Sequence, residues 1–273
     1  MDLDGLFDRR VVYEMPGMDA VHVRKDLTYK HVDSLDLRMD VYAPPDRDGP
    51  LPAALLIAGD AWPDTIKDSK DWGVFISFGQ LVALSGMMAV TFNHRSTHSL
   101  TRLADVAQDV DDLVVFVRTN AGSFGIDPER LALWAFSAGP PFGFKTALVD
   151  KPEYVRCLVS YYGILDLQQE REDVKPEVSD EALQQHSALY HLALRSQGWP
   201  PMFIARAGLD FPHFNQSVDH FVALALEKNI PLEMMNHPAG VHGFDTLNDD
   251  EHSRRIIRRT LQFLREQLLP SRE

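Results

Sequence analysis

Short runs of hydrophobic residues recur along the chain, separated by polar stretches. They span 53–58, 87–92, 131–136, 155–161, 201–205 and 231–235. Runs of this length with few polar breaks are typical of parallel strands that are buried on both faces. An earlier segment alternates instead, with Leu35, Leu37, Met39 and Val41 at every second position. This period of two predicts a half-buried strand that ends at the prolines after Ala43.

Helical patterns lie between the predicted strands. The segment 105–118 places Val106, Val110, Leu113, Val114 and Val117 on one stripe. We expect Asp109, Asp111 and Asp112 to lie mostly outside this stripe, facing water. Segments 215–228 and 257–268 show the same helical spacing of apolar residues. Strands that alternate with helices predict a mostly parallel sheet with right-handed crossovers and helices on both faces.

One domain with insertions is the simplest organisation for 273 residues that contain no repeat and no low-complexity linker. We therefore expect a single α/β domain over 1–273, with an N-terminal extension over 1–20. The stretch 166–200 is long, polar and acidic and breaks the alternation, so we predict a cap-like insertion there. We expect this insertion to lie over the pocket.

Charge and cysteine content exclude several classes of protein. Lys and Arg number 27 against 40 Asp and Glu, a formal net charge of −13. This balance argues against nucleic acid or an anionic membrane as a partner. The single Cys157 lies in a predicted strand, where a buried structural thiol is expected. No secretory signal and no membrane-length apolar run is evident, so we expect a cytoplasmic protein.

The strongest chemical signal is the segment Trp134-Ala135-Phe136-Ser137-Ala138-Gly139. A predicted strand leads directly into a small-x-Ser-x-Gly turn and then a helix. Such a strained turn projects a serine hydroxyl above the sheet, and its small neighbours prevent clashes. Ser137 is therefore the candidate nucleophile, although a serine that only caps a helix remains the alternative.

A nucleophilic serine needs a base, and the base needs an orienting carboxylate. Two later loops, each following a predicted strand, offer these groups in the order Ser, Asp, His. One contains Asp210 and the other contains His242, in the segment Gly240-Val241-His242-Gly243-Phe244. Both strand ends are expected at the same rim as Ser137, because the carboxyl ends of parallel strands meet at one edge.

With these motifs the chain resembles serine esterases of the α/β-hydrolase superfamily, near the hormone-sensitive-lipase-like and feruloyl-esterase-like acyl hydrolases. The segment 125–139 is similar to the region that leads into that family's nucleophile turn, and Phe92-Asn93-His94-Arg95 resembles its Asp-Tyr-Arg signature. The similarity covers roughly 35–268. It implies the α/β-hydrolase fold, Ser137 as nucleophile, His242 as general base and Asp210 as orienting acid.

Other assignments remain open at this point. Asp245 and Asp219 are alternative acids, and His237 is an alternative base. His94 and His98 are four residues apart, but no third ligand stands at a standard spacing, so no metal is expected. We also expect no cofactor. His186 and His191 are in or near the insertion. They could line the pocket, but we expect them on the surface.

The predicted oxyanion hole departs from the resembled family. One donor is expected from the Ala138 N–H, and the other from the loop after the 53–58 strand. That family often has His-Gly-Gly-Gly-Trp in this loop, whereas this chain has Ala58-Gly59-Asp60-Ala61-Trp62. Gly59, Asp60 and Ala61 are the candidate loop residues. Trp62 aligns with the family's tryptophan, and we expect it to bind substrate.

A carboxylate in an oxyanion loop would oppose the charge that the loop must stabilise. We therefore predict that Asp60 points out of the hole, as a helix cap. The alternatives are neutralisation by Arg95 or Lys67, and a weak esterase. A second departure is Gly139-Pro140-Pro141. Two prolines restrict the residues before them, so we expect the helix to begin one or two residues late while the turn persists.

The sequence thus predicts a serine hydrolase that cleaves small carboxylic esters through an acyl-enzyme. The alternatives are a non-catalytic α/β-hydrolase that binds a small ligand and a small-peptide serine peptidase. A homodimer is a possible assembly, since dimers are common among similar esterases. The segment 166–181 has seven acids and two bases, a net charge of 2 − 7 = −5. It therefore predicts that neutral or cationic esters are preferred over anionic ones, with the preference fading at high salt.

Overall fold

The computed structural model describes residues 5, 7–32, 34–149, 152–171, 176–194 and 198–269. Its centre is an eight-stranded sheet in the order β1-β2-β4-β3-β5-β6-β7-β8. The strands are β1 His22–Val32, β2 Leu35–Ala43, β3 Leu51–Ile57, β4 Met88–Phe92, β5 Ile126–Phe136, β6 Val155–Tyr161, β7 Met202–Ala207 and β8 Leu232–His237. β2 runs antiparallel to both β1 and β4, and every pairing from β4 to β8 is parallel. The predicted α/β-hydrolase fold is confirmed.

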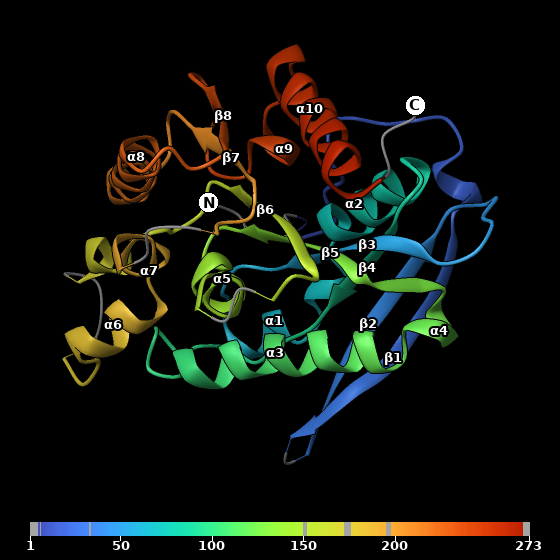
Figure 1. Cartoon of the computed structure of the whole chain (residues 1–273), viewed down its shortest axis with the longest axis horizontal. Helices are drawn as coiled ribbons and strands as arrows, with labels where there is room; N and C mark the ends of the chain where they lie inside the picture. Colours follow the sequence, from blue (N-terminus) through green and yellow to red (C-terminus); the bar gives the residue numbers. More distant parts are fainter. Residues whose placement is uncertain are drawn as a thin grey trace.

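Helices cover both faces of the sheet (Figure 1). They are α1 Pro63–Ile66, α2 Gly73–Leu84, α3 Leu103–Thr119, α4 Ala121–Phe124, α5 Pro140–Val149, α6 Asp180–His186, α7 Ala188–Leu194, α8 Pro212–Glu227, α9 Phe244–Leu247 and α10 Glu251–Leu268. Short 3₁₀ turns span Met18–Ala20, Ser69–Asp71 and Leu167–Glu170. Among the described residues, no helix is both long and apolar enough to cross a bilayer.

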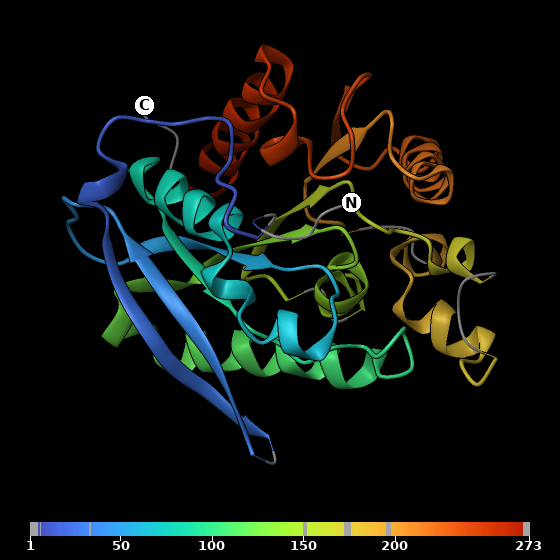
Figure 2. The ribbon, with the colours of Figure 1, turned by 180° about the vertical axis from the view of Figure 1, so that it is seen from behind.

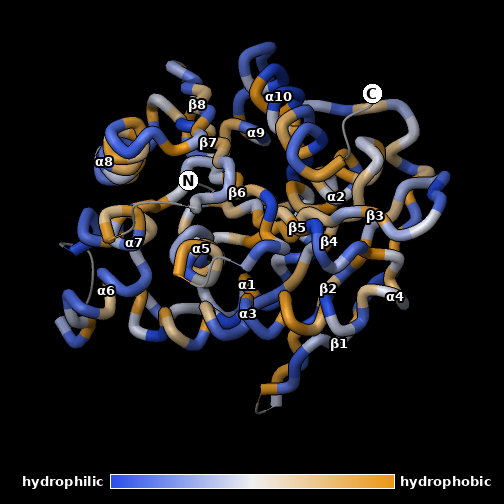
Figure 3. Tube along the Cα trace, in the orientation of Figure 1, coloured by the Kyte–Doolittle hydropathy of each residue, from blue (hydrophilic) through white to orange (hydrophobic). Residues whose placement is uncertain are grey.

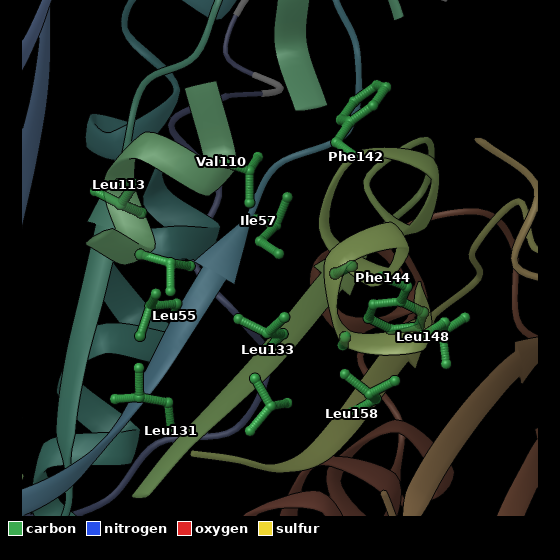
Figure 4. Packing of buried hydrophobic residues seen from close by; sticks show 14 of the residues in the cluster. Leu55, Ile57, Val110, Leu113, Leu131, Leu133, Phe142, Phe144, Leu148 and Leu158 are labelled. Carbon is green, nitrogen blue, oxygen red and sulfur yellow. The ribbon is translucent and has the colours of Figure 1, made fainter. Parts of the chain in front are cut away.

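Two hydrophobic layers hold the sheet between these helices. On one face the strands pack against α3 and α5, as Figure 4 shows for Leu55 and Leu133 on strands, Val110 on α3 and Leu148 on α5. On the other face they pack against α2 and α10, and viewing the molecule from behind shows the same arrangement (Figure 2). The central strands are hydrophobic along most of their length while α10 is polar on its outer side (Figure 3). This explains why the buried strands read as continuous apolar runs.

The six hydrophobic runs form β3 to β8. Their ends fall within two residues of the predicted ends, apart from β5, which begins five residues earlier, at Ile126. β1 and α2 were not predicted. β1 lies at one edge of the sheet and has a single buried residue, Tyr29. It shows register shifts against β2 between Arg24 and Leu27 and between Thr28 and Lys30. Its pattern therefore does not alternate as a regular strand does.

The prediction that Asp109 faces water is wrong. Asp109 is fully buried on α3, where its carboxylate accepts hydrogen bonds from Arg95 at 2.8 Å and from Lys30 at 2.6 Å. Burial acts to raise the pKa of Asp109, but these hydrogen bonds outweigh it and hold the pKa below its usual range. The partners come from β1 and from the residues after β4, so the helical pattern alone gave no sign of them.

The described residues of the insertion do not lie over the pocket, where the sequence suggested. Its described helices α6 and α7 pack beside α5, and α7 also contacts α8. Figure 1 shows them at the side of the domain, next to α5. His186 is buried there, contrary to the expected surface position, and its Nδ1 lies 2.9 Å from the Ala182 carbonyl oxygen. Residues 172–175 and 195–197 of the insertion, which include Glu172 and Asp173, lie outside the described residues.

Candidate active site

Ser137 stands on the sharp turn between β5 and α5. Its φ of 54° lies in the left-handed region, which costs energy for any residue other than glycine. The turn is held in place because the Ser137 N–H donates to Tyr161 O at 3.0 Å and its carbonyl accepts from Ile164 N at 2.9 Å. α5 begins at Pro140, so both prolines lie in the first helical turn, where a missing N–H costs little.

The structure brings Ser137, His242 and Asp210 together. His242 Nε2 lies 2.9 Å from Ser137 Oγ, and His242 Nδ1 lies 2.9 Å and 3.0 Å from the two carboxylate oxygens of Asp210. The Asp210 side chain is 1% exposed and also accepts the Phe211 N–H at 2.8 Å, whereas the His242 side chain is 31% exposed. A buried acid therefore orients an imidazole whose other nitrogen faces an accessible hydroxyl.

Two loops that are distant in sequence are locked together to place Asp210 and His242. Gly208 N donates to His237 O at 2.8 Å, and Leu209 N donates to Gly240 O at 2.8 Å. A side chain at position 208 would put its Cβ 2.5 Å from the Pro238 carbonyl oxygen. Glycine is needed at this position because the backbones of the loops after β7 and β8 approach so closely.

The competing residues have other partners. Asp219 on α8 forms an ion pair with Arg206 at 2.8 Å. His237 is buried at the end of β8, where its Nε2 lies 3.1 Å from Asp250 Oδ1 and 3.0 Å from Ser253 Oγ. Asp245 is fully buried and accepts a hydrogen bond from the Tyr162 hydroxyl at 2.9 Å. None of these contacts joins Ser137.

Asp245 nevertheless lies beside the site. The Tyr162 ring, whose hydroxyl it binds, is 4.7 Å from the His242 ring, centroid to centroid. Burial raises the pKa of Asp245 to about 6, although the Tyr162 hydrogen bond and the His242 charge act to lower it. Tyr162 itself has a positive φ of 38°. Sequence reasoning did not identify Tyr162, since it lies just past the end of β6 with no motif around it.

The loop 59–61 lies against the nucleophile turn. A Cβ at Gly59 would be 2.8 Å from Ser137 Cβ and 3.2 Å from Ala138 N, so only glycine fits there without a shift. The Asp60 carboxylate accepts the Thr97 N–H at 3.0 Å, the Thr97 hydroxyl and, at 3.4 Å, the Ser96 hydroxyl. It caps no helix, contrary to the detail we expected. It binds the loop after β4.

Neither of the cations considered for Asp60 pairs with it. Arg95 forms ion pairs with Asp109 and Asp105, and Lys67 pairs with Asp64 at 3.8 Å. His94 is buried, with its Nδ1 2.7 Å from the Arg95 carbonyl oxygen. Within the described part of the chain, no group of three or more His, Cys, Asp or Glu side chains is placed to hold a metal ion.

A cavity of about 630 Å³ opens at Ser137 and His242. Its walls are largely aromatic and aliphatic, with Phe7, Trp72, Phe75, Phe136, Tyr162, Phe211, Leu209, Val241 and Leu247 among them. Gly59, Asp60 and Ala61 also line it. Neither lysine nor arginine is among the described lining residues. An apolar group can therefore be buried next to the nucleophile, while a charged group would lose its hydration with no cation in the wall to replace it.

Two expectations about the pocket are wrong. No described residue of the insertion lines the cavity, and Phe7 from the N-terminal segment does. Trp62 is 75% exposed and lies outside the lining, whereas Trp72, ten residues later, is part of it. Trp72 precedes α2, a helix that sequence reasoning missed, so nothing in the sequence pattern directed attention to it.

The fold defines the class of protein, an α/β hydrolase. The family model described as BD-FAE matches residues 39–210, and the chain belongs to this family. The matched region contains Ser137 and ends at Asp210, so His242 is placed by the structure and not by the match.

Curated relatives are similar over a limited region. A probable isoprenylcysteine alpha-carbonyl methylesterase from Oryza sativa subsp. japonica is 34% identical over 102 residues, which are 37% of this chain and 23% of that protein. An isoprenylcysteine alpha-carbonyl methylesterase from Arabidopsis thaliana is 31% identical over 117 residues, 43% of this chain and 26% of the relative. The match thus spans about a quarter of the length of these relatives.

Solved structures share the whole fold. A truncated carbohydrate esterase from gut microbiota has a TM-score of 0.73 at 17% identity, covering 90% of this chain and 96% of the other. A thermophilic esterase from Thermogutta terrifontis has a TM-score of 0.71 at 20% identity, covering 94% of this chain and 97% of the other. At such identities the likeness concerns the fold alone.

Proposed function

We propose that the protein is a carboxylic-ester hydrolase that works through an acyl-enzyme on Ser137. One observation carries the proposal, namely the unbroken hydrogen-bonded chain from Asp210 through His242 to Ser137 Oγ, with 2.9 Å at each link. A serine in such a chain can lose its proton to the imidazole as it attacks a carbonyl carbon. Membership of the BD-FAE family and the methylesterase names of the curated relatives support the same reaction class.

The proposed reaction uses Ser137, His242 and Asp210 in two stages. Ser137 Oγ forms a bond to the ester carbonyl carbon while its proton passes to His242 Nε2. The tetrahedral intermediate collapses, the bond to the alcohol oxygen breaks, and His242 returns the proton to that oxygen. Water then attacks the acyl-enzyme with the same proton transfers and releases the acid. Asp210 holds the imidazole in the tautomer that accepts at Nε2 and stabilises the imidazolium.

The developing oxyanion is assigned to the Ala138 N–H and to backbone donors of the loop 59–61. The close approach of Gly59 to Ala138 N supports this assignment. Asp60 does not supply a donor through its side chain, and its charge is taken up by Thr97 and Ser96. Two backbone donors therefore serve the intermediate while the neighbouring carboxylate is held by other groups.

The expected substrates are small uncharged esters with an apolar acyl or alcohol group. The apolar wall of the cavity favours such groups, and the volume of about 630 Å³ accommodates a molecule of modest size. The relatives' names point to different esters, a methyl ester in one case and a carbohydrate ester in another, so the alcohol part is not assigned from them.

A fluorophosphonate probe and a panel of p-nitrophenyl esters test the proposal. We expect covalent labelling of the wild type, and its loss in Ser137→Ala together with a fall in kcat/KM of about 10⁴-fold. Asp210→Asn tests the orienting acid. Asp219→Asn, which removes the alternative acid, is its matched control and should keep nearly full activity. Absence of both labelling and ester hydrolysis in the folded wild type would contradict the proposal and favour a ligand-binding protein.

A further inference from the structure

The N-terminal segment contributes Phe7 to the wall of the cavity and connects α2 with α9, two helices that also carry lining residues. Phe7 O accepts the Gly73 N–H at 2.7 Å, at the start of α2. Five residues later, Val12 N donates to Asp245 O at 2.8 Å, at the start of α9. Between them Val11 is buried, with its N–H 3.4 Å from Ser77 Oγ on α2. Residues 7–12 therefore bridge α2 and α9, with Phe7 in the cavity wall.

Gly73 shows how closely this bridge is seated. A Cβ at position 73 would lie 2.4 Å from Asp8 O and 2.6 Å from Arg9 O, both backbone atoms. Because backbone atoms cannot rotate away, a side chain here would push the segment off α2. The sequence thus contains a glycine at the start of α2, where the backbone of the N-terminal segment approaches most closely.

A row of aromatic rings connects this segment to the nucleophile. Phe7 packs on Trp72 with 4.4 Å between ring centroids, Trp72 lies 6.0 Å from Phe75, and Phe75 lies 5.3 Å from Phe136. All four rings line the cavity, and Phe136 directly precedes Ser137. Phe7 is the last ring in this series of contacts, which starts at Phe136 beside the nucleophile. We infer that a short acyl group on Ser137 stays near Phe136 and that only a longer one extends to Phe7.

We propose that Phe7, supported by Trp72, is a specificity-determining residue that contacts the far end of long apolar groups bound in the cavity. This inference rests on the proposed ester hydrolysis. Phe7 lies outside the region 39–210 that the family model matches, so the proposal for Phe7 does not come from the family match. Such a contact strengthens the binding of long esters and leaves short ones unaffected, because apolar stabilisation scales with the area buried.

The test compares p-nitrophenyl acetate, butyrate, hexanoate and octanoate. In Phe7→Ala we expect kcat/KM for octanoate to fall about tenfold, mainly through KM, and kcat/KM for acetate to stay within about twofold. Gly73→Ala should change the octanoate-to-acetate ratio in the same direction, because it displaces residues 8 and 9. Phe116→Ala is the matched control, as Phe116 is a half-buried ring on α3 that packs on Phe124 and does not line the cavity.

Two results would overturn the inference. One is an unchanged chain-length profile in Phe7→Ala, and the other is an equal loss on all four esters, as a purely structural role would give. Binding separates this inference from the proposed function. In the Ser137→Ala background, where esters are bound but not cleaved, calorimetry should show about tenfold weaker octanoate-ester binding on adding Phe7→Ala. If the wild type cleaves no ester but Phe7→Ala still weakens octanoate-ester binding, only the proposed hydrolytic function fails. If Phe7→Ala does not weaken this binding, the inference about Phe7 fails.

Discussion

The hydrogen bonds that hold Asp60 allow a quantitative prediction about the proposed oxyanion hole. The Thr97 hydroxyl donates to Asp60 and at the same time accepts the Leu100 N–H at 3.0 Å. Thr97→Val removes this hydroxyl at nearly constant volume in a fully buried position. The carboxylate then keeps only the Thr97 N–H and the longer contact from Ser96, and it gains freedom to turn toward the reacting oxygen.

The size of the effect follows from simple electrostatics. A carboxylate about 5 Å from the oxyanion, at an effective dielectric constant of about 20, repels it by about 3 kcal/mol. One oxyanion donor contributes about 3–4 kcal/mol, so a fully redirected Asp60 would cancel one donor. Because the Thr97 N–H still restrains the carboxylate, we expect Thr97→Val to lower kcat by about 10- to 100-fold with little change in KM.

A double-mutant cycle on a short p-nitrophenyl ester isolates the charge. Asp60→Asn alone should change kcat/KM by less than about threefold, and Asp60→Asn combined with Thr97→Val should recover most of the lost kcat. Thr97→Ser, which keeps the hydroxyl, is the matched control. Equal impairment of Thr97→Val with and without Asp60→Asn would show that the loss is structural. A tenfold gain in Asp60→Asn or Asp60→Gly alone would refute the reasoning, because it would mean that the native carboxylate already faces the oxyanion.

Further predictions concern stability and substrate charge. Because burial raises the pKa of Asp245 to about 6 from 3.8, folding becomes less favourable as pH rises from about 4 to 6, by about 3 kcal/mol. Urea unfolding across this range should show that Asp245→Asn removes this loss; parallel curves for the two proteins would disprove it. Asp109→Asn leaves Arg95 and Lys30 without their buried partner and should lower the free energy of unfolding at pH 7 by about 3 kcal/mol, against less than about 1 kcal/mol for the surface change Asp48→Asn. Carboxylate-bearing esters should be poorer substrates than matched neutral ones at both low and high salt, since the cavity wall has no cation among its described lining residues; equal rates would contradict this.

Most of the sheet could be predicted from the sequence because its inner strands are covered on both faces. The resulting apolar runs indicate β3 to β8 directly, and the helical spacing of apolar residues indicates α3, α8 and α10. β1 was not predicted because it is an edge strand with irregular register against β2. α2 was not predicted because its own residues are apolar around almost the whole helix. It therefore has no polar face that would reveal a helical period.

Some residues of the candidate site could be predicted from the sequence and others could not. Ser137, Asp210 and His242 follow strand ends, and strand ends of a parallel sheet must meet at one rim. No such rule predicts the positions of Phe7, Trp72 and Tyr162. They line the cavity because segments far apart in sequence pack together there. The acidic insertion was placed over the pocket by analogy with other members of the superfamily, and its described residues pack beside α5 and α8 instead. The expected preference for neutral over anionic esters is therefore argued from the described cavity lining and not from the charge of the insertion.

The exposed edge strand β1 has a consequence for the behaviour of the protein at high concentration. An unpaired strand edge is a template on which another chain can form hydrogen bonds and start aggregation. β1 has Arg24, Lys25, Asp26 and Lys30 along its length, and its two register shifts interrupt the regular row of backbone donors and acceptors. A second molecule that adds a strand here would lose ladder hydrogen bonds at each shift and would have to accommodate the exposed charges of Arg24 and Lys25. The irregularity that hides β1 from sequence reasoning thus protects this side of the sheet from intermolecular β-pairing.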